Sequence, residues 1–422
     1  MRITISGGLL LDPSSGREST SDLHLADGLI AAVGAAPAGF VPDRSIDARG
    51  LAVCPGLVDL AVRFREPGFE HRASLESELA AAAAGGITAV CCPPDMDPPL
   101  DEPGLVEMLA RRAQAIGLAR VLPLGALTAG LRGERLAELA ELASAGCVGF
   151  SQGDRSLGDH AVMLRAMQYA ATFGLSVWLR PQDGALARLG VAHEGMISTR
   201  LGLPGIPAWA ETLAVSALLL MSKETGARLH LCRLSSADSV AMIRQAKASG
   251  VSVTCDVSAA HIHLSEIDIG YFDSNCRLSP PLRAQRDRDA LLAGLADGTI
   301  DAVCSDHCPV DEDGKTVPFA EAEPGATGLE TLLPLTIMRS QPTSLSKLLS
   351  VVTVGPARIL GLPVPRMEPG ARADVCIFDP DHWWRVDAAV LLSKGKNTPF
   401  AGTEVRGQVR YCLVAGSVVF ER

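Results

Sequence analysis

The chain has 422 residues, 47% of them hydrophobic, and its 48 acidic and 38 basic residues give a formal net charge of −10. This length is sufficient for one large core and a small satellite domain, and 41 glycines with 27 prolines are typical of an α/β protein with many tight connections. A net negative charge without lysine and arginine clusters argues against nucleic acid and anionic membranes as partners.

Targeting signals and cysteine usage indicate the cellular compartment. No uninterrupted apolar run reaches the roughly 18 residues of a membrane span, and the opening residues, Met1–Ile5, are too polar for a signal peptide. The 11 cysteines show no CxxC motif and no regular spacing, which favours reduced thiols. These patterns predict a cytoplasmic protein that does not enter a membrane.

The first fifty residues have the alternation of β-hairpins. Leu23 and Leu25 lead into a turn at Asp27–Gly28, and a returning strand covers Ile30–Val33.

From residue 55 the pattern changes to alternating strands and helices, which predicts a parallel sheet. Ser74–Ala84 and Ser236–Ala248 read as helices that begin at serine and stop near glycine, as helix caps favour. Eight such βα units predict a TIM (β/α)8 barrel, whose functional residues follow the carboxyl ends of the strands. The expected strands are Leu57–Leu60, Ile87–Cys92, Arg120–Leu124, Cys147–Phe150, Leu175–Leu179, Arg228–Cys232, Val251–Val257 and Thr299–Cys304.

The last fifty residues again predict antiparallel strands. Asp374–Phe378 is one strand, and Val409–Val414 and Val418–Phe420 flank a turn at Ala415–Gly416. We expect the strands of both chain ends to meet in one small β-sandwich. The fold class is therefore α/β, with a composite β-sandwich domain of residues 1–54 plus 365–422 and a barrel domain of residues 55–364.

A set of motifs lies at the expected strand ends and in the loops that follow them. The motifs are Pro55–Asp59 with Arg65–Gly68, Gly85–Thr88 with Cys91–Cys92, Pro280–Arg283, Ser305–Pro309, Gly328–Thr331 and Ser393–Phe400. Together they resemble the bacterial dihydroorotases, amidohydrolases that cyclise carbamoyl aspartate during pyrimidine synthesis. The resemblance runs nearly end to end, and a generic TIM barrel would not supply such a set.

The resemblance implies a particular metal site. Family members generate a nucleophile from water on one or two zinc ions. Two histidines follow the first strand, and an aspartate or carboxylated lysine after the fourth bridges the metals. Histidines after the fifth and sixth strands complete the site, and an aspartate after the eighth is both ligand and proton shuttle.

The four histidine positions of that site hold other residues in this chain. The first-strand positions are Ala61 and Arg63, and the fifth- and sixth-strand positions are Arg180 and Arg233. Alanine has no donor atom, and a guanidinium stays protonated and cannot bind a cation. The sequence therefore predicts that no metal cofactor is bound.

The two carboxylate positions have diverged to different extents. The bridging position falls on Gln152 or Gly153, with Asp154 displaced by one or two residues, whereas Asp306 keeps its family identity as a vestigial catalytic residue. We expect the three arginines to fill the former metal volume, with one or more paired to Asp306. Because three guanidiniums exceed one carboxylate, further acids are candidates for recruitment, namely Asp59, Glu66, Asp95 and Asp154.

Substrate recognition also departs from the family pattern. Arg65 is in register with the arginine that holds the substrate carboxylate, and His307 is either a remnant of substrate binding or a structural histidine. The family asparagine after the second strand is Asp95, and the histidine expected after the eighth strand is Val310.

Several other histidines and cysteines are potential metal ligands, but roles in loops and in packing are favoured for them. His261 and His263 form the one HxH pair and are expected on the surface or in a loop. Cys304 and Cys308 flank Asp306, with Cys304 expected to pack at the strand end, and His230 is expected to be a hydrogen-bonded core histidine.

The resemblance implies a dihydroorotase-like protein of pyrimidine biosynthesis that is catalytically inactive. Some bacteria carry such homologues as structural partners of aspartate transcarbamoylase, which would make this chain part of a homo- or hetero-oligomer. One alternative is an active amidohydrolase with an altered zinc site built from Asp154, Asp306, His261 or His263. A third is a protein that binds a small molecule in the emptied pocket.

Overall fold

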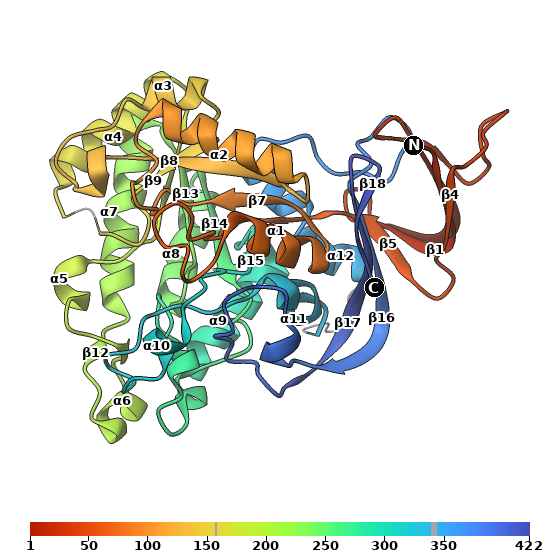
Figure 1. Cartoon of the computed structure of the whole chain (residues 1–422). Helices are drawn as coiled ribbons and strands as arrows, with labels where there is room; N and C mark the ends of the chain where they lie inside the picture. Colours follow the sequence, from red (N-terminus) through yellow and green to blue (C-terminus); the bar gives the residue numbers. More distant parts are fainter. Residues whose placement is uncertain (157, 339–343) are drawn as a thin grey trace.

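The computed structural model describes residues 1–156, 158–338 and 344–422 and contains a parallel barrel beside a sheet that holds both chain ends (Figure 1). The barrel strands pair in the order β15-β14-β13-β10-β9-β8-β7-β6. All eight predicted strands are present, which confirms the fold class. Their bounds are β6 (Leu57–Asp59), β7 (Ile87–Cys92), β8 (Arg120–Ala126), β9 (Gly149–Ser151), β10 (Ser176–Leu179), β13 (Arg228–Leu231), β14 (Val253–Ser258) and β15 (Ala302–Cys304).

The first and last strands of the barrel approach each other just beyond their carboxyl ends. His307 N donates to the carbonyl of Ala61 and Arg63 N donates to the carbonyl of His307, both at 2.9 Å. These bonds form a parallel bridge between Val62 and His307. The barrel thus closes between the segment after β6 and the Ser305–Pro309 motif, and the two bonds hold these backbones together.

Helices cover the outside of the barrel. Ser74 and Ser236 accept hydrogen bonds from the backbone as the N-caps of α1 and α8, as the sequence predicted. The principal helices are α1 (Leu75–Ala84), α2 (Pro103–Ile116), α3 (Leu139–Ser144), α4 (His160–Thr172), α7 (Trp209–Thr225), α8 (Ala237–Ala248), α9 (Gln285–Asp297), α11 (Leu332–Met338), α12 (Leu345–Ser350) and α13 (Val354–Ile359). Shorter elements in the loops are α5 (Gly184–Ala187), β11 (Ala192–His193), α6 (Met196–Leu201), β12 (Gly205–Ile206) and α10 (Glu312–Lys315).

Strands from both chain ends form the terminal sheet, in the order β18-β17-β16-β5-β1-β2-β3 with β4 paired to β1. The predicted turns at Asp27–Gly28 and Ala415–Gly416 are present, each with positive φ angles. A core that includes Ile3, Leu25 and Ile377 lies within this sheet. The strands are β1 (Ile3–Asp12), β2 (Arg17–Ala26), β3 (Leu29–Val33), β4 (Arg44–Asp47), β5 (Ala52–Pro55), β16 (Val375–Arg385), β17 (Glu404–Val414) and β18 (Ser417–Glu421).

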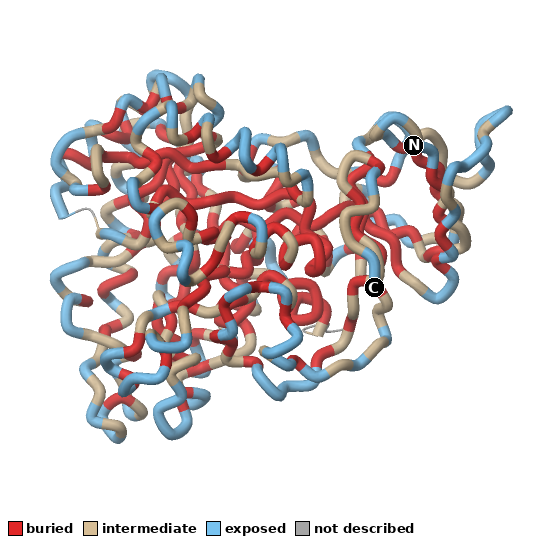
Figure 2. The backbone as a smooth tube through the Cα atoms, viewed as in Figure 1, coloured by how far each residue is buried: buried red, intermediate tan, exposed pale blue. Residues whose placement is uncertain are grey.

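The barrel interior is a packed core, and Figure 2 shows the buried strands at its centre. Strands β6 and β7 are buried along their whole length, as near-continuous apolar parallel strands should be. Trp178 is fully buried in this interior. Among the described residues, no helix combines the length and apolar character needed to cross a membrane.

Candidate functional site: an arginine–aspartate cluster at the barrel mouth

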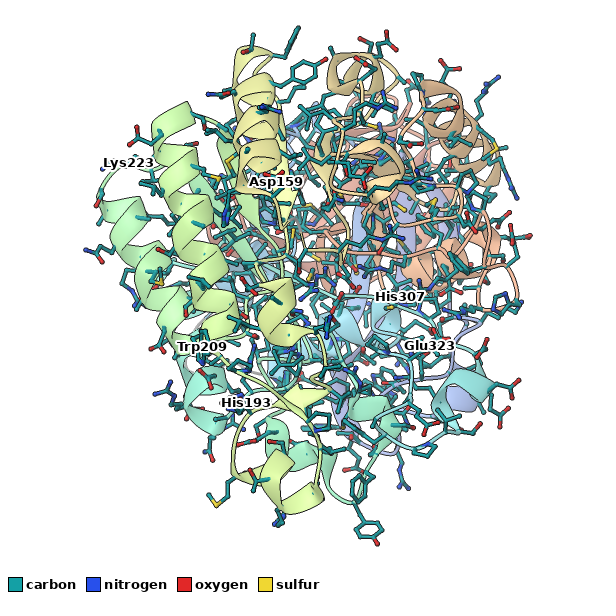
Figure 3. All side chains as sticks on the ribbon, turned by 90° about the vertical axis from the view of Figure 1, so that its left-hand side faces the viewer. Asp159, His193, Trp209, Lys223, His307 and Glu323 are labelled. Atoms are coloured by element: carbon teal, nitrogen blue, oxygen red, sulfur yellow. The ribbon has the colours of Figure 1, made fainter. Side chains whose placement is uncertain are left out.

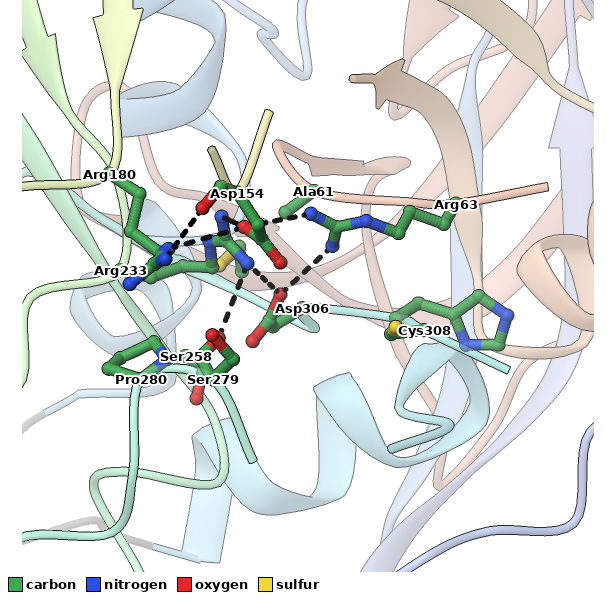
Figure 4. Close-up of polar contacts among 12 residues, drawn as sticks. Ala61, Arg63, Asp154, Arg180, Arg233, Ser258, Ser279, Pro280, Asp306 and Cys308 are labelled. Atoms are coloured by element: carbon green, nitrogen blue, oxygen red, sulfur yellow. Dashed lines mark hydrogen bonds and ion pairs between the residues drawn. The ribbon is translucent and has the colours of Figure 1, made fainter. Parts of the chain in front are cut away.

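The positions that diverge from the family metal site come together at the carboxyl ends of the strands (Figure 4). Arg63 follows β6, Arg180 follows β10, Arg233 follows β13 and Asp306 follows β15. Ala61 and Arg63 alternate with Val62, so both lie on one side of the extended segment. Figure 3 views the molecule from the side away from the terminal sheet, with Asp159 at the start of α4 and Trp209 at the start of α7.

Asp154 is the centre of this group of charges. Its Oδ1 lies 3.1 Å from Arg63 Nη2 and 3.3 Å from Arg180 Nε, and it accepts a hydrogen bond from Arg233 Nη2. The Asp154 carbonyl also accepts a 2.7 Å hydrogen bond from Arg180 Nη2. One carboxylate thus joins three guanidiniums.

Two further aspartates complete the cluster. Asp306 Oδ1 lies 2.9 Å from Arg233 Nη1 and 3.5 Å from Arg63 Nη1. Asp95 Oδ2 lies 2.9 Å from Arg63 Nε. Three arginines therefore face three aspartates and their formal charges cancel, as the burial of ionised groups requires. We call these six residues the arginine–aspartate cluster.

The sequence offered four acids as further partners of the arginines. Two of them, Asp59 and Glu66, lie outside the cluster. Asp59 accepts backbone hydrogen bonds from Ala61 and Ser305. Glu66 pairs with Arg112 and caps the first turn of α1. Both acids are thus engaged by partners outside the cluster.

Burial and the surrounding charges shift the pKa values within the cluster. Burial alone would raise the pKa of Asp154, but Arg233, Arg63 and Arg180 hold it well below its usual range. Burial raises the pKa of Asp306, although Arg233 and Arg63 oppose the shift. Burial lowers the pKa of Arg180, and the two neighbouring guanidiniums act in the same direction. Arg180 is therefore the least compensated cation of the three.

The backbone around the cluster keeps unusual conformations. Arg65, Arg233 and Asp306 have φ angles of 62°, 55° and 50°, in the left-handed region that side chains other than glycine rarely adopt. Gly153 also has a positive φ of 63°, and a Cβ atom there would come 3.0 Å from Asp95. Glycine at the bridging position thus lets Asp95 approach and reach Arg63.

Gln152, the other candidate for the bridging position, is directed elsewhere. It is buried, and its Oε1 accepts a 3.0 Å hydrogen bond from Thr128 Oγ1. Asp154 supplies the carboxylate of this loop instead.

Arg65 and His307, the expected remnants of substrate binding, are both held by protein atoms. Arg65 donates to the Pro309 carbonyl at 3.1 Å and to Cys308 Sγ at 2.9 Å. His307 is fully buried, 2.6 Å from Glu78 Oε2, and its Nδ1 accepts from Gly328 N. No part of the His307 side chain is accessible to solvent, which agrees with the structural alternative for this histidine.

The HxH pair lies in the loop after β14, one of the two positions expected for it, but His261 is not on the surface. That side chain is buried, with Nδ1 2.7 Å from Ser258 Oγ and Nε2 3.2 Å from the Pro280 carbonyl. Burial lowers its pKa to about 4, so the ring is neutral. His263 Nε2 lies 2.7 Å from the Leu335 carbonyl. Both histidines fix loops to the barrel.

One group within the described ranges has the spacing of metal ligands. His230, Cys232 and Asp256 offer ligand atoms that all lie within 4.8 Å of one another. The His230 ring, however, is already bonded to Thr254 and to Asp256, each at 2.9 Å. Asp256 Oδ1 also accepts a 2.7 Å hydrogen bond from Arg233 N. The group is thus satisfied without an ion, as predicted for His230.

Zinc does not fit the residues at the barrel mouth. The former ligand positions present a methyl group and three cations, and the two nearby carboxylates, Asp154 and Asp306, are bound by those cations. A dication would have to displace buried guanidiniums and then meet their charge. The arrangement can hold the strand ends together, but it offers no free ligand set.

Comparisons with known proteins identify the family. A dihydroorotase-like family model matches residues 50–239, and an amidohydrolase family model matches residues 210–419. A dihydroorotase-like protein of Pseudomonas aeruginosa is 43% identical over 430 residues and covers 100% of both chains. A protein of a Geobacter species named dihydroorotase is 40% identical over 423 residues, again covering 100% of both chains.

Solved structures agree with the architecture. The L-hydantoinase of Arthrobacter aurescens superimposes with a TM-score of 0.88 at 26% identity, covering 99% of this chain and 96% of that one. Since its relatives match over their whole length and the barrel carries the family motifs, the chain belongs to the dihydroorotase-like proteins of the amidohydrolase family.

Proposed function

We propose that this chain is a noncatalytic dihydroorotase-like protein of pyrimidine biosynthesis. The observation that carries the proposal is the arginine–aspartate cluster, in which Asp154 bridges Arg63, Arg180 and Arg233 in place of metal ions. A vacated site would leave its carboxylates without partners. Here complementary charges occupy the site, which is what selection for stability after the loss of chemistry would produce.

The chemical cost of losing the metal supports inactivity. Metal coordination lowers the pKa of bound water from about 15.7 to about 7, which corresponds to roughly 12 kcal/mol of nucleophile activation. The three carboxylates at the mouth, Asp95, Asp154 and Asp306, are all held in ion pairs with the arginines of the cluster.

We further propose that the protein acts as a structural partner of aspartate transcarbamoylase in a homo- or hetero-oligomer. The support is the family resemblance together with the 43% identity to the dihydroorotase-like protein of Pseudomonas aeruginosa, which covers 100% of both chains. Native mass spectrometry of the two purified proteins, alone and mixed, tests this. A stoichiometric complex is expected, and two separate species in the mixture would refute the partnership.

The second candidate is an active dihydroorotase with an altered zinc site. It is favoured by the name dihydroorotase given to relatives that are 40–41% identical over nearly the whole chain. The discriminating experiment measures cyclisation of carbamoyl aspartate and bound zinc on one preparation, with and without added zinc. Wild type and D306N are compared, with D297N as a control at an exposed ion pair.

The two candidates give opposite outcomes in this experiment. The noncatalytic proposal expects no turnover above the buffer and substoichiometric zinc in all three proteins. Turnover in wild type and D297N that disappears in D306N would establish the enzyme instead. Stoichiometric zinc with no turnover would overturn the argument that the cluster excludes metal.

A further inference from the structure

A cavity of about 600 Å³ lies at the end of the barrel opposite the arginine–aspartate cluster. Its walls come from the amino ends of β6, β7 and β8, represented by Val58, Thr88 and Arg120, and from the terminal sheet around Asp374 and Ala415. Figure 1 shows the terminal sheet packed against this end of the barrel. We call this cavity the rear pocket; junctions between structural units are common places for small-molecule sites.

The local excess of positive charge in the rear pocket comes from two arginines. Arg120 and Arg372 share the single carboxylate of Asp374, whereas Arg366, also in the lining, is paired with Glu368 at 3.0 Å, and Asp27 lines the pocket as well. A pair of arginines on one carboxylate attracts anions.

Arg120 and Arg372 share a single carboxylate. Arg120 Nη2 donates to Asp374 Oδ2 at 3.0 Å, and Arg372 Nε donates to Asp374 Oδ1 at 3.0 Å. Asp374 also accepts a 2.8 Å hydrogen bond from Ala415 N. Asp374 is thus fully engaged, while each arginine retains donors.

The unused donors point to a missing acceptor. Arg120 Nε is buried and has no hydrogen-bond partner in the part of the chain that the structure describes. Burial lowers the pKa of Arg120, and Arg372 contributes in the same direction. The Arg372 side chain is 48% exposed and contacts Asp374 through Nε, so its terminal nitrogens face solvent and are open to a ligand. A buried unpaired donor costs free energy that an incoming acceptor would recover.

We propose that the rear pocket binds a small molecule with an oxyanion group, held by Arg120 and Arg372. Guanidinium forks bind carboxylates and phosphates in two-pronged geometry, and two arginines with one shared aspartate provide such donors. Val58 and Leu362 supply an apolar wall, so the ligand combines its anion with an apolar portion. The site is independent of the proposed loss of catalysis, because it shares no residue with the barrel mouth.

The test is isothermal titration of the full-length protein with two probes, inorganic phosphate and succinate, at constant ionic strength. The variants are R372Q, R120Q and the control R244Q. Arg244 matches Arg372 well, since their side chains are 47% and 48% exposed and each pairs with one aspartate. Circular dichroism verifies that each variant is folded, and R372Q removes a half-exposed group whose loss the fold tolerates.

We expect at least one probe to bind wild type and R244Q equally and to bind R372Q at least about tenfold more weakly. Binding of phosphate alone identifies a phosphate-bearing ligand, and binding of succinate alone identifies a carboxylate. The proposal is overturned if neither probe binds, or if R372Q binds as wild type does. General stabilisation by excluded salts cannot mimic the result, because it would act equally on R372Q and R244Q.

Discussion

Arginine side chains meet aspartates at both ends of the barrel, but the ratio of the two differs. At the mouth, three arginines face three aspartates, and the guanidiniums occupy the site themselves. In the rear pocket, Arg120 and Arg372 share Asp374 beside about 600 Å³ of open volume. The same residue type thus closes one site and keeps donors available in the other.

An arginine paired with aspartate can therefore have either of two roles. A guanidinium that is matched by carboxylates is part of the scaffold, and removing one partner leaves an unpaired buried charge. A guanidinium with unused donors beside a cavity is prepared for a ligand. The ratio of arginines to carboxylates distinguishes a scaffold arginine from a ligand-binding arginine better than burial alone does.

The largest effect is expected at the mouth. D306A removes the partner that Arg233 contacts at 2.9 Å and Arg63 at 3.5 Å, and it leaves their charges in a buried site. The free energy of unfolding should fall by roughly 3–5 kcal/mol. Urea denaturation measures it, and D297A at the exposed pair with Arg244 should lose under about 1 kcal/mol. Equal losses in the two variants would show that the cluster does not stabilise the barrel.

Asp59, beneath the cluster, gives a pH-dependent effect. Burial raises its pKa to about 6, and Oδ2 lacks a hydrogen-bond partner among the described residues. Between about pH 4 and pH 6 the folded state therefore holds a proton that the unfolded state has lost, so stability falls as pH rises through this window.

The substitution D59N removes this titration. The variant should gain roughly 3 kcal/mol relative to wild type between pH 4 and pH 7. Urea unfolding of both proteins across this range measures the difference. D297N is the control, and its effect on stability should have the opposite sign. Partial burial raises the pKa of Asp297, but its hydrogen bonds lower the pKa further, so the ionised carboxylate stabilises the folded state. Parallel curves for wild type and D59N would contradict the pKa assigned to Asp59.

Within the cluster, Arg233 and Arg180 should differ. Arg233 contacts both Asp154 and Asp306, whereas Arg180 contacts one carboxylate and the side-chain oxygen of Gln182. We expect R233M to destabilise the protein by about 1–2 kcal/mol more than R180M, because it removes ion pairs to two carboxylates instead of one. Thermal and urea unfolding of the two methionine variants test this, and a larger loss in R180M would reverse the ranking.

The fold could be predicted from the sequence because the strand, helix and capping patterns along the chain agree with one another. Alternating strand and helix patterns located all eight barrel strands to within a few residues, and Ser74 and Ser236 marked the helix starts. Hydrophobic periodicity and capping act over short distances, so a single chain displays them.

The ion-pair partners within the site were harder to predict from the sequence. The sequence identified Arg63, Arg180 and Arg233 as occupants of the former metal positions, but it treated Asp306 as their main counter-ion. Asp154 is the shared partner in the structure, because its loop places the carboxylate one or two residues beyond the family position. Such a shift depends on loop conformation, including the positive φ of Gly153, which no local pattern specifies.

Substitutions in the rear pocket should have the smallest effect on stability, and they test whether Arg120 and Arg372 share Asp374. R372Q removes a half-exposed ion pair, so we expect a loss of at most about 1 kcal/mol that shrinks in high salt. Because Arg120 and Arg372 compete for Asp374, the double variant R120Q/R372Q should lose more stability than the sum of the single variants. A urea-unfolding cycle of the four proteins measures this coupling. Simple additivity would mean that the two arginines do not share the carboxylate in solution, and that the donors attributed to the rear pocket are already satisfied by water.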